Sequence, residues 1–157
     1  EDRQRTVRRN DHCRQTLKSD RLFFDTNVLL DHLLDREPFA DDATELWSMA
    51  ERREIVGSIS AISFSFVYYI VRHGANERAA RRAGRGLRDV FEIVEVDAQI
   101  IHQARDSAFP DFEDAIQHAC AIRAGATYLV TRDLAGFRRS EVPVVTPGAY
   151  LAGRSES

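Results

Sequence analysis

Three aspartates stand where the elements of a parallel β-sheet bring polar groups together. Asp25 ends the apolar run 21–24, Asp133 follows the apolar run 127–131, and Asp114 lies in the first turn of a helical pattern. Ligands of open parallel sheets bind in the crevice beyond the carboxyl ends of the strands. We therefore expect Asp25 and Asp133 to point into one crevice, with Asp114 reaching it from its helix.

Each of these aspartates also has a simpler structural interpretation. Asp25 can cap the helix that follows it, since helix starts leave backbone N–H groups without partners. Asp111, one turn before Asp114, can be an N-cap with Asp114 as the acidic first-turn residue, or it can assist the acidic cluster. Asp133 can close a turn with Gly136 in the segment TRDLAGF.

Three carboxylates close together repel one another, and this repulsion has to be offset. Two charges about 4 Å apart repel by about 4 kcal/mol at the effective dielectric of a protein surface. A shifted protonation state, an arginine or a divalent cation can supply that compensation. Oxygen ligands without a cysteine or histidine cluster favour Mg²⁺ or Mn²⁺ over zinc. A cation of this kind lowers the pKa of bound water and offsets charge on a phosphoryl group, which is the chemistry of phosphodiester hydrolysis.

Several polar residues near the three acids have less specific roles. Asn27 supplies a short polar side chain at the helix start after Asp25. We expect Asp31 to be solvated or to support the site from behind, and Glu113 to be rotated away into solvent. His118 is interpreted as a partly buried, hydrogen-bonded histidine rather than a ligand.

The elements that must position these residues alternate along the chain. Apolar periodicity and helix caps predict strands at 21–25, 54–60, 91–96, 127–131 and 143–146, and helices from Val28 and over 38–50, 61–73, 76–90, 98–108 and 110–124, with a last helical turn from Pro147. This order predicts an α/β fold, a single three-layer α/β/α sandwich with a parallel central sheet.

The size and composition fit one domain. The chain has 157 residues, with 43% hydrophobic and 30% charged side chains, and we expect a charged N-terminal extension over 1–20, flexible or partner-binding, a domain over 21–152 and a tail over 153–157. It has no apolar run of the roughly 20 residues that a membrane span needs. Cys13 and Cys120 show neither pairing nor metal-ligand spacing, so we expect a reduced, cytoplasmic protein.

Charge is distributed unevenly along the sequence. The net charge is −3, yet basic residues gather at 3–14 and 72–88, and acidic ones at 31–45 and 106–114. Arg78, Arg82 and Arg85 lie on the polar side of a predicted helix, which is either a solvated face or a track for an RNA backbone. Arg132, next to Asp133, is the best single candidate for a phosphate contact.

A scarcity of lysine excludes several kinds of enzyme. Lys18 is the only lysine, and it lies in the predicted extension. A Walker-type phosphate loop, a Schiff-base enzyme and a receiver-type phosphoaspartate switch each need a lysine in the folded domain. A phosphatase of the haloacid type ranks last among the possible functions, because it also needs a lysine, together with DxDxT where this chain has DTN.

The segments FFDTNVLLD, DFEDAIQHACA and YLVTRD, in this order and spacing, resemble the PIN domain, and more closely the VapC-type ribonuclease toxins of bacterial toxin–antitoxin systems. The resemblance extends from about Arg21 to Leu151. It implies a metal-dependent endoribonuclease whose acidic cluster is Asp25, Asp114 and Asp133. It also implies a supporting hydroxyl at Thr131, Mg²⁺ or Mn²⁺ as cofactor, RNA as substrate, a homodimer and an antitoxin partner.

One feature departs from the pattern of many family members. They carry a glutamate on the helix after the second strand, whereas 61–72 contains no acid and the matching turn reads Ser63–Phe64–Ser65–Phe66. Two functions therefore remain open. The first is a nuclease that cleaves single-stranded RNA by a metal-activated water, and the second is a catalytically impaired PIN-like module that binds RNA or protein.

Overall fold

A parallel sheet of five strands forms the centre of the molecule, in the order β3-β2-β1-β4-β5. The computed structural model describes residues 19–156. The strands are β1 (Arg21–Phe24), β2 (Val56–Ser60), β3 (Glu92–Val94), β4 (Tyr128–Val130) and β5 (Val144–Val145). All four strand pairs are parallel. The predicted α/β fold with a parallel sheet is therefore confirmed.

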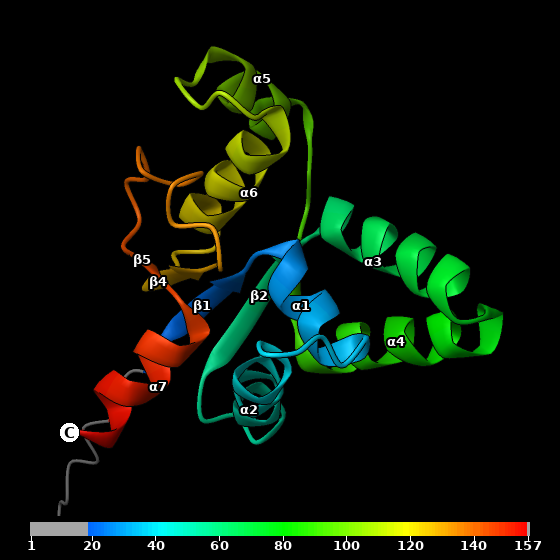
Figure 1. Cartoon of the computed structure of the whole chain (residues 1–157). Helices are drawn as coiled ribbons and strands as arrows, with labels where there is room; N and C mark the ends of the chain where they lie inside the picture. The colour runs from blue at the N-terminus through cyan, green and yellow to red at the C-terminus, as the bar shows by residue number, and fades with distance from the viewer. Residues whose placement is uncertain (1–18, 157) are drawn as a thin grey trace, which may run out of the picture.

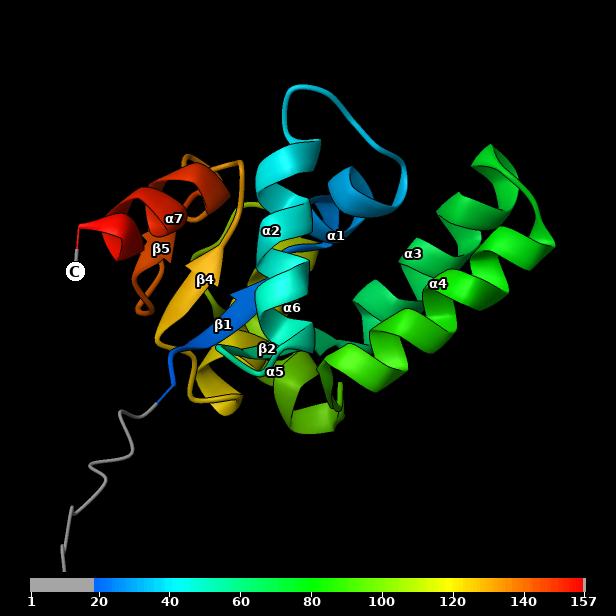
Figure 2. The same cartoon turned by 90° about the horizontal axis from the view of Figure 1, so that it is seen from below.

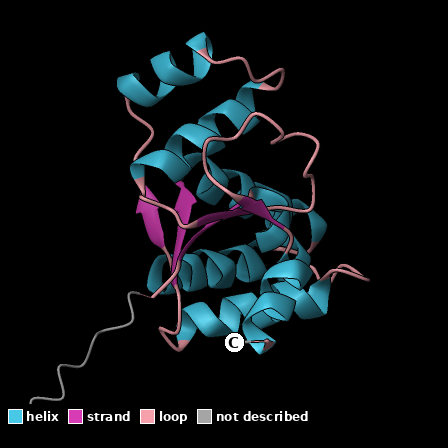
Figure 3. Ribbon diagram, turned by 90° about the vertical axis from the view of Figure 1, so that its left-hand side faces the viewer, coloured by secondary structure: helices cyan, strands magenta, loops and turns pink. Residues whose placement is uncertain are grey.

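Helices cover both faces of this sheet (Figures 1 and 3). They are α1 (Thr26–Leu33), α2 (Ala40–Glu51), α3 (Ala61–Gly74), α4 (Glu77–Val90), α5 (Ala98–Asp106), α6 (Phe112–Arg123) and α7 (Pro147–Ser155). Figure 2 shows α2 in front of the strands and α6 behind them. Helices α3 and α4 form an antiparallel pair that projects to one side of the sheet (Figures 1 and 2).

The central strand β1 explains why there are two cores. Side chains alternate between the faces of a strand. Leu22 and Phe24 pack with α1 to α4 in one buried cluster, while Phe23 packs with α5 and α6 in the other. These apolar side chains are almost fully buried, so each face of β1 lies against a hydrophobic core, as expected for the central strand of a parallel sheet.

The helix caps follow the predicted chemistry. The side chains of Asn76, Asp97 and Asp111 accept hydrogen bonds from backbone N–H groups at the starts of α4, α5 and α6. Gly125, with φ of 63°, follows the end of α6. The interpretation of Asp111 as an N-cap is confirmed.

Helix α4 is unbroken although it contains two glycines. A Cβ at Gly86 would lie 3.2 Å from Trp47 Cζ2, and one at Gly84 would lie 3.5 Å from Phe64 and Tyr68. Both glycines therefore let α4 approach its neighbours closely, and this packing offsets their low helix propensity.

Other boundaries differ from those expected. Strands β3 and β5 are shorter than predicted, and α7 extends to Ser155 instead of forming one turn. The predicted extension and Cys13 lie outside the described residues, apart from 19 and 20. In the described part of the chain, no helix has the length and apolar character needed to span a bilayer.

Candidate functional site at the carboxyl edge of the sheet

Asp25 is held rigidly between β1 and α1. Its Oδ1 accepts a hydrogen bond from the backbone N–H of Thr26 at 2.8 Å, and its Oδ2 accepts one from Thr131 Oγ1 at 2.8 Å. Its own N–H donates to Val130 O at 3.0 Å, across to β4. Only 8% of Asp25 is exposed. Asp25 is therefore the N-cap of α1 and also lies at the carboxyl edge of the sheet.

Burial affects the ionisation of this carboxyl group. Removal from water raises the pKa of Asp25, and the hydrogen bonds from Thr131 and Thr26 act in the opposite direction. The charge of Asp133 raises this pKa further, whereas that of Arg132 lowers it. Asp25 thus interacts electrostatically with residues that follow β4.

Asp114 and Asp133 converge on Gly136. Asp133 Oδ1 accepts a hydrogen bond from the backbone N–H of Gly136 at 3.0 Å. A Cβ at Gly136 would lie 2.5 Å from Asp133 Oδ2 and 3.1 Å from Asp114 Oδ2. The two carboxylates therefore face the same point, and they can do so only because residue 136 has no side chain. The expected turn between Asp133 and Gly136 is present as well.

Thr131 connects the two strand-end acids. Its hydroxyl donates to Asp25 Oδ2 and accepts a hydrogen bond from the backbone N–H of Asp133 at 3.0 Å. Thr131 is fully buried, so this geometry is shielded from competition by water.

Negative charge is concentrated around Asp114. Burial, followed by the charges of Asp111, Asp25, Asp133 and Glu113, raises the pKa of Asp114 from 3.8 to about 7. Carboxylates repel one another in this way when no cation lies between them. The three aspartates singled out in the sequence thus belong to one electrostatic cluster.

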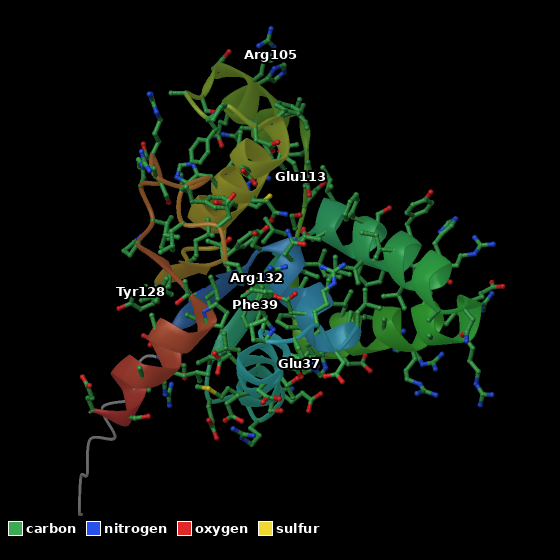
Figure 4. The ribbon with its side chains drawn as sticks, viewed as in Figure 1. Glu37, Phe39, Arg105, Glu113, Tyr128 and Arg132 are labelled. Atoms are coloured by element: carbon green, nitrogen blue, oxygen red, sulfur yellow. The ribbon has the colours of Figure 1, made fainter. Side chains whose placement is uncertain are left out.

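Glu113 belongs to this cluster as well, although the sequence predicted only a solvated side chain. Its side chain is exposed, as predicted. Burial of part of its carboxyl group, together with the charges of Asp25 and Asp111, nevertheless raises its pKa. Figure 4 shows Glu113 at the start of α6. The acidic run from Asp111 to Asp114 was the sequence signal for this larger cluster. A helix that begins at the edge of the sheet brings its whole first turn near Asp25.

A neutral polar network lies beside Asp25 where α3 begins. Ser63 Oγ lies 2.7 Å from Thr26 Oγ1 and 3.0 Å from Ser60 Oγ. Gln117 Nε2, from α6, donates to Ser63 Oγ at 2.9 Å and to Thr26 Oγ1 at 2.8 Å. Ser60, Ser63 and Gln117 are buried. Helix α3, which contains no acidic residue, thus contributes the Ser63 hydroxyl to this network. Phe66, on the same helix, is 43% exposed.

Asp31 is buried, so the solvated one of its two expected roles is wrong. It is 1% exposed, and its Oδ2 lies 2.8 Å from Arg132 Nε, with Arg36 Nη1 4.0 Å from its Oδ1. The Arg132 guanidinium also stacks on Phe39, 4.1 Å from the ring centroid. Figure 4 shows Arg132 and Phe39 side by side. An acid on α1 is buried because an arginine about a hundred residues later reaches it.

The remaining candidates have separate contacts. Asn27 is exposed, and its Oδ1 accepts a hydrogen bond from Arg36 Nη1 at 3.5 Å. His118 is buried, its Nε2 accepts a hydrogen bond from the backbone N–H of Glu141 at 2.9 Å, and its ring packs on Phe109. The interpretation of His118 as a hydrogen-bonded structural residue is confirmed.

The donor set fits a hard divalent cation in its chemistry. It consists of carboxylate oxygens with an excess of negative charge, and Gly136 leaves space between two of them. Over residues 19–156, however, no three acidic, histidine or cysteine side chains are close enough together to hold one ion. Binding of one ion by Asp25, Asp114 and Asp133 would therefore require their carboxylates to move closer together.

Comparison with known proteins identifies the family. A family model described as PIN domain matches residues 21–135. The chain belongs to the PIN domain family. A search of curated proteins by sequence found no match.

Solved structures share this PIN fold. A toxin–antitoxin complex from Klebsiella pneumoniae is 28% identical, with a TM-score of 0.60 over 80% of this chain and 97% of that chain. VapC20 from Mycobacterium tuberculosis, described as a sarcin–ricin loop cleaving toxin, is 19% identical, with a TM-score of 0.61 over 75% of this chain and 94% of that chain. VapBC2 from Rickettsia felis, bound to a promoter DNA fragment, is 16% identical, with a TM-score of 0.60 over 80% and 98%. The fold is thus that of the VapC structures.

Proposed function

We propose that this PIN domain protein is a metal-dependent endoribonuclease that cleaves single-stranded RNA, and that it is the toxin of a toxin–antitoxin pair. The observation that carries the proposal is the convergence of Asp114 and Asp133 on Gly136, beside an Asp25 held by Thr131. Membership of the PIN domain family supports the nuclease class.

The side chains have distinct roles in this proposal. Asp25, Asp114 and Asp133 bind the cation, with Asp111 and Glu113 adding negative charge around it. Thr131 orients Asp25 and the backbone of Asp133 together. Bound Mg²⁺ or Mn²⁺ would lower the pKa of a water molecule and offset charge on the scissile phosphate. Hydrolysis by water requires no covalent intermediate with the protein.

The biological setting is inferred from the related structures. The Klebsiella relative is a toxin–antitoxin complex, and the Mycobacterium protein is described as cleaving the sarcin–ricin loop. We propose an antitoxin partner, a homodimer and a cytoplasmic site of action for this chain. Expression of the chain alone should then arrest growth of a bacterial host, and the Asp25→Asn variant should not.

RNA cleavage tests the enzymatic part. We expect single-stranded RNA to be cut with Mg²⁺ or Mn²⁺, and cleavage to stop with EDTA or in Asp25→Asn. Asp106→Asn is the matched control, since this exposed acid at the end of α5 lies outside the site. Cleavage that survives both EDTA and Asp25→Asn would refute the proposal.

A non-catalytic PIN module is the alternative. It is favoured by the neutral Ser63 network on α3 and by the absence, among the described residues, of a preassembled group of three ligands. An impaired module would bind RNA or a protein partner without cleaving RNA at any concentration of Mg²⁺ or Mn²⁺.

A further inference from the structure

A cavity of about 280 Å³ is lined in part by Arg132, the residue before Asp133 of the acidic site. Its lining comes from the starts of α2 and α7 and from the residue that precedes Asp133, and it consists of Phe39, Asp42, Arg132, Thr146, Pro147 and Gly148. Because Arg132 precedes Asp133 in the chain and its charge acts on Asp25, a ligand in this cavity would lie near the proposed metal ligands.

Arg132 is held in a fixed orientation inside this cavity. Asp31 Oδ2 lies 2.8 Å from its Nε, and Phe39 stacks against its guanidinium group. The Arg132 side chain is 29% exposed. In the described part of the chain its terminal Nη atoms have no hydrogen-bond partner, so they are available to a ligand.

Asp42 supplies the opposite charge. This exposed residue in the first turn of α2 makes no hydrogen bond or ion pair within residues 19–156. Its Oδ2 would lie 3.0 Å from a Cβ at Gly148, so the glycine leaves room for the carboxylate at the start of α7. Arg132 and Asp42 line the same cavity without pairing, and space remains between them.

The carboxylate makes this cavity a poor site for phosphate. An anion about 4 Å from Asp42 would be repelled by about 4 kcal/mol at the effective dielectric of a protein surface, which opposes the attraction of Arg132. A neutral group that offers both hydrogen-bond acceptors and donors fits better. RNA bases have this character, and proteins bind unstacked bases by aromatic stacking and by contacts to their polar edges. Phe39, 40% exposed, supplies an aromatic wall.

Among the bases, guanine matches this arrangement of charges. Arginine donates to guanine O6 and N7, which are acceptors. The N1–H and N2–H groups of guanine lie beside O6 and can donate together to the two oxygens of one carboxylate. Adenine, cytosine and uracil do not offer two adjacent N–H donors next to an acceptor.

We propose that the cavity lined by Phe39, Asp42 and Arg132 binds a guanine base of the RNA, near the acidic site. Asp42 accepts from N1–H and N2–H, and Arg132 donates to O6. This inference rests on the proposed ribonuclease function and names a determinant of its substrate specificity.

Binding to short RNAs tests the proposal without cleavage. The probes are fluorescein-labelled A₇ and the same RNA with a central guanosine, inosine or cytidine, measured by fluorescence anisotropy in EDTA. The guanosine RNA should bind about tenfold more tightly than A₇. Inosine lacks the N2 amine and should lose most of that gain.

Asp42→Asn should remove the preference for guanosine over A₇. Asp41→Asn is the matched control, because it removes the same charge from the same turn of α2 and Asp41 does not line the cavity. Asp42 is preferred to Arg132 as the test position, because loss of Arg132 would leave Asp31 buried without its partner, and that destabilises a fold. Thermal unfolding of both variants should match the parent protein.

Four results would overturn the inference: equal affinity for the guanosine RNA and A₇, a preference for cytidine, no binding of any probe, or a guanosine preference that persists in Asp42→Asn. Cleavage of the same RNAs with Mg²⁺ separates the two proposals. Cleavage without base preference would refute the guanine site alone, whereas guanosine-specific binding without cleavage would refute the nuclease function alone.

Discussion

Asp114 lies half-buried beside four other acids, and its pKa is raised from 3.8 to about 7. The folded protein therefore holds a proton that the unfolded chain releases between these two values. Its contribution to stability is greatest at low pH and is lost as the pH rises from roughly 4 to 7. A cation that binds the ionised carboxylates removes this loss.

Metal ions and pH should therefore act together on stability. Mg²⁺ or Mn²⁺ should raise the melting temperature more at pH 7.5 than at pH 5.5, because protons compete with the cation at the lower pH. Differential scanning fluorimetry at both pH values measures this. Asp114→Asn should reduce the metal effect at pH 7.5, and an equal metal effect at both pH values would contradict the prediction.

The sequence predicted single residues well where local chemistry decides their role. Asp25 and Asp111 are caps at strand-to-helix or loop-to-helix junctions, which neighbouring residues determine. The burial of Asp31 could not be predicted, because it depends on Arg132, which is distant in sequence. Glu113 is exposed as predicted, but its electrostatic interaction with Asp25 was not predicted, because it depends on how α6 packs against the sheet.

Among the elements, the loop after β4 determines whether the carboxylates of Asp114 and Asp133 can lie close together. Gly136→Ala would place a Cβ 2.5 Å from Asp133 Oδ2 and push the Asp133 carboxylate away from Asp114. We expect RNA cleavage to fall on the order of a hundredfold, as for other misplacements of about 1 Å. Metal affinity should weaken in parallel, as measured by isothermal titration calorimetry.

Gly74→Ala is the control for this prediction. A Cβ at Gly74 meets no atom within 4 Å, so this variant should cleave RNA like the parent protein. Unchanged cleavage in Gly136→Ala would show that the two carboxylates need not converge there.

The polar network links α1, α3 and α6 and provides a prediction for stability. Ser63→Ala removes the hydroxyl that contacts Thr26 Oγ1, Ser60 Oγ and Gln117 Nε2. The free energy of unfolding should fall by roughly 1–3 kcal/mol, because buried polar groups are left without hydrogen-bond partners. Ser65→Ala, exposed on the same helix, should change it by less than about 0.5 kcal/mol. Urea unfolding measures both, and equal effects would contradict the role of the network.

Most elements could be predicted because apolar periodicity and caps are local signals. The exceptions were the ends of strands and the length of α7. Strand ends depend on where neighbouring strands stop pairing, and α7 is stabilised by a tertiary contact, in which Tyr150 donates a hydrogen bond to Asp20 at 2.8 Å. Neither the strand ends nor the length of α7 can be predicted from one segment of the sequence alone.

At the scale of the whole molecule, the projecting α3–α4 pair carries exposed arginines. Arg78, Arg82 and Arg85 have no ion pair within residues 19–156, whereas Arg81 is paired with Glu77 and Arg88 with Asp89. The predicted role of the three unpaired arginines in RNA binding stays a prediction.

Salt dependence of RNA binding tests that role. Replacing Arg78, Arg82 and Arg85 by alanine should weaken RNA binding and reduce the slope of log K against log salt by about 0.7 for each phosphate that the protein no longer neutralises. Arg81→Ala is the control, since its charge is already paired. An unchanged slope in the triple variant would assign the arginines to a solvated face.

The position of β1 in the middle of the sheet has a consequence for how the protein is made. Thr131 and Asp133, which complete the surroundings of Asp25, are translated more than a hundred residues after it. A nascent chain that ends before β4 lacks one neighbour of its central strand and one of the three proposed ligands. A protein that cuts RNA would thus remain harmless to its own messenger until Thr131 and Asp133 have been translated.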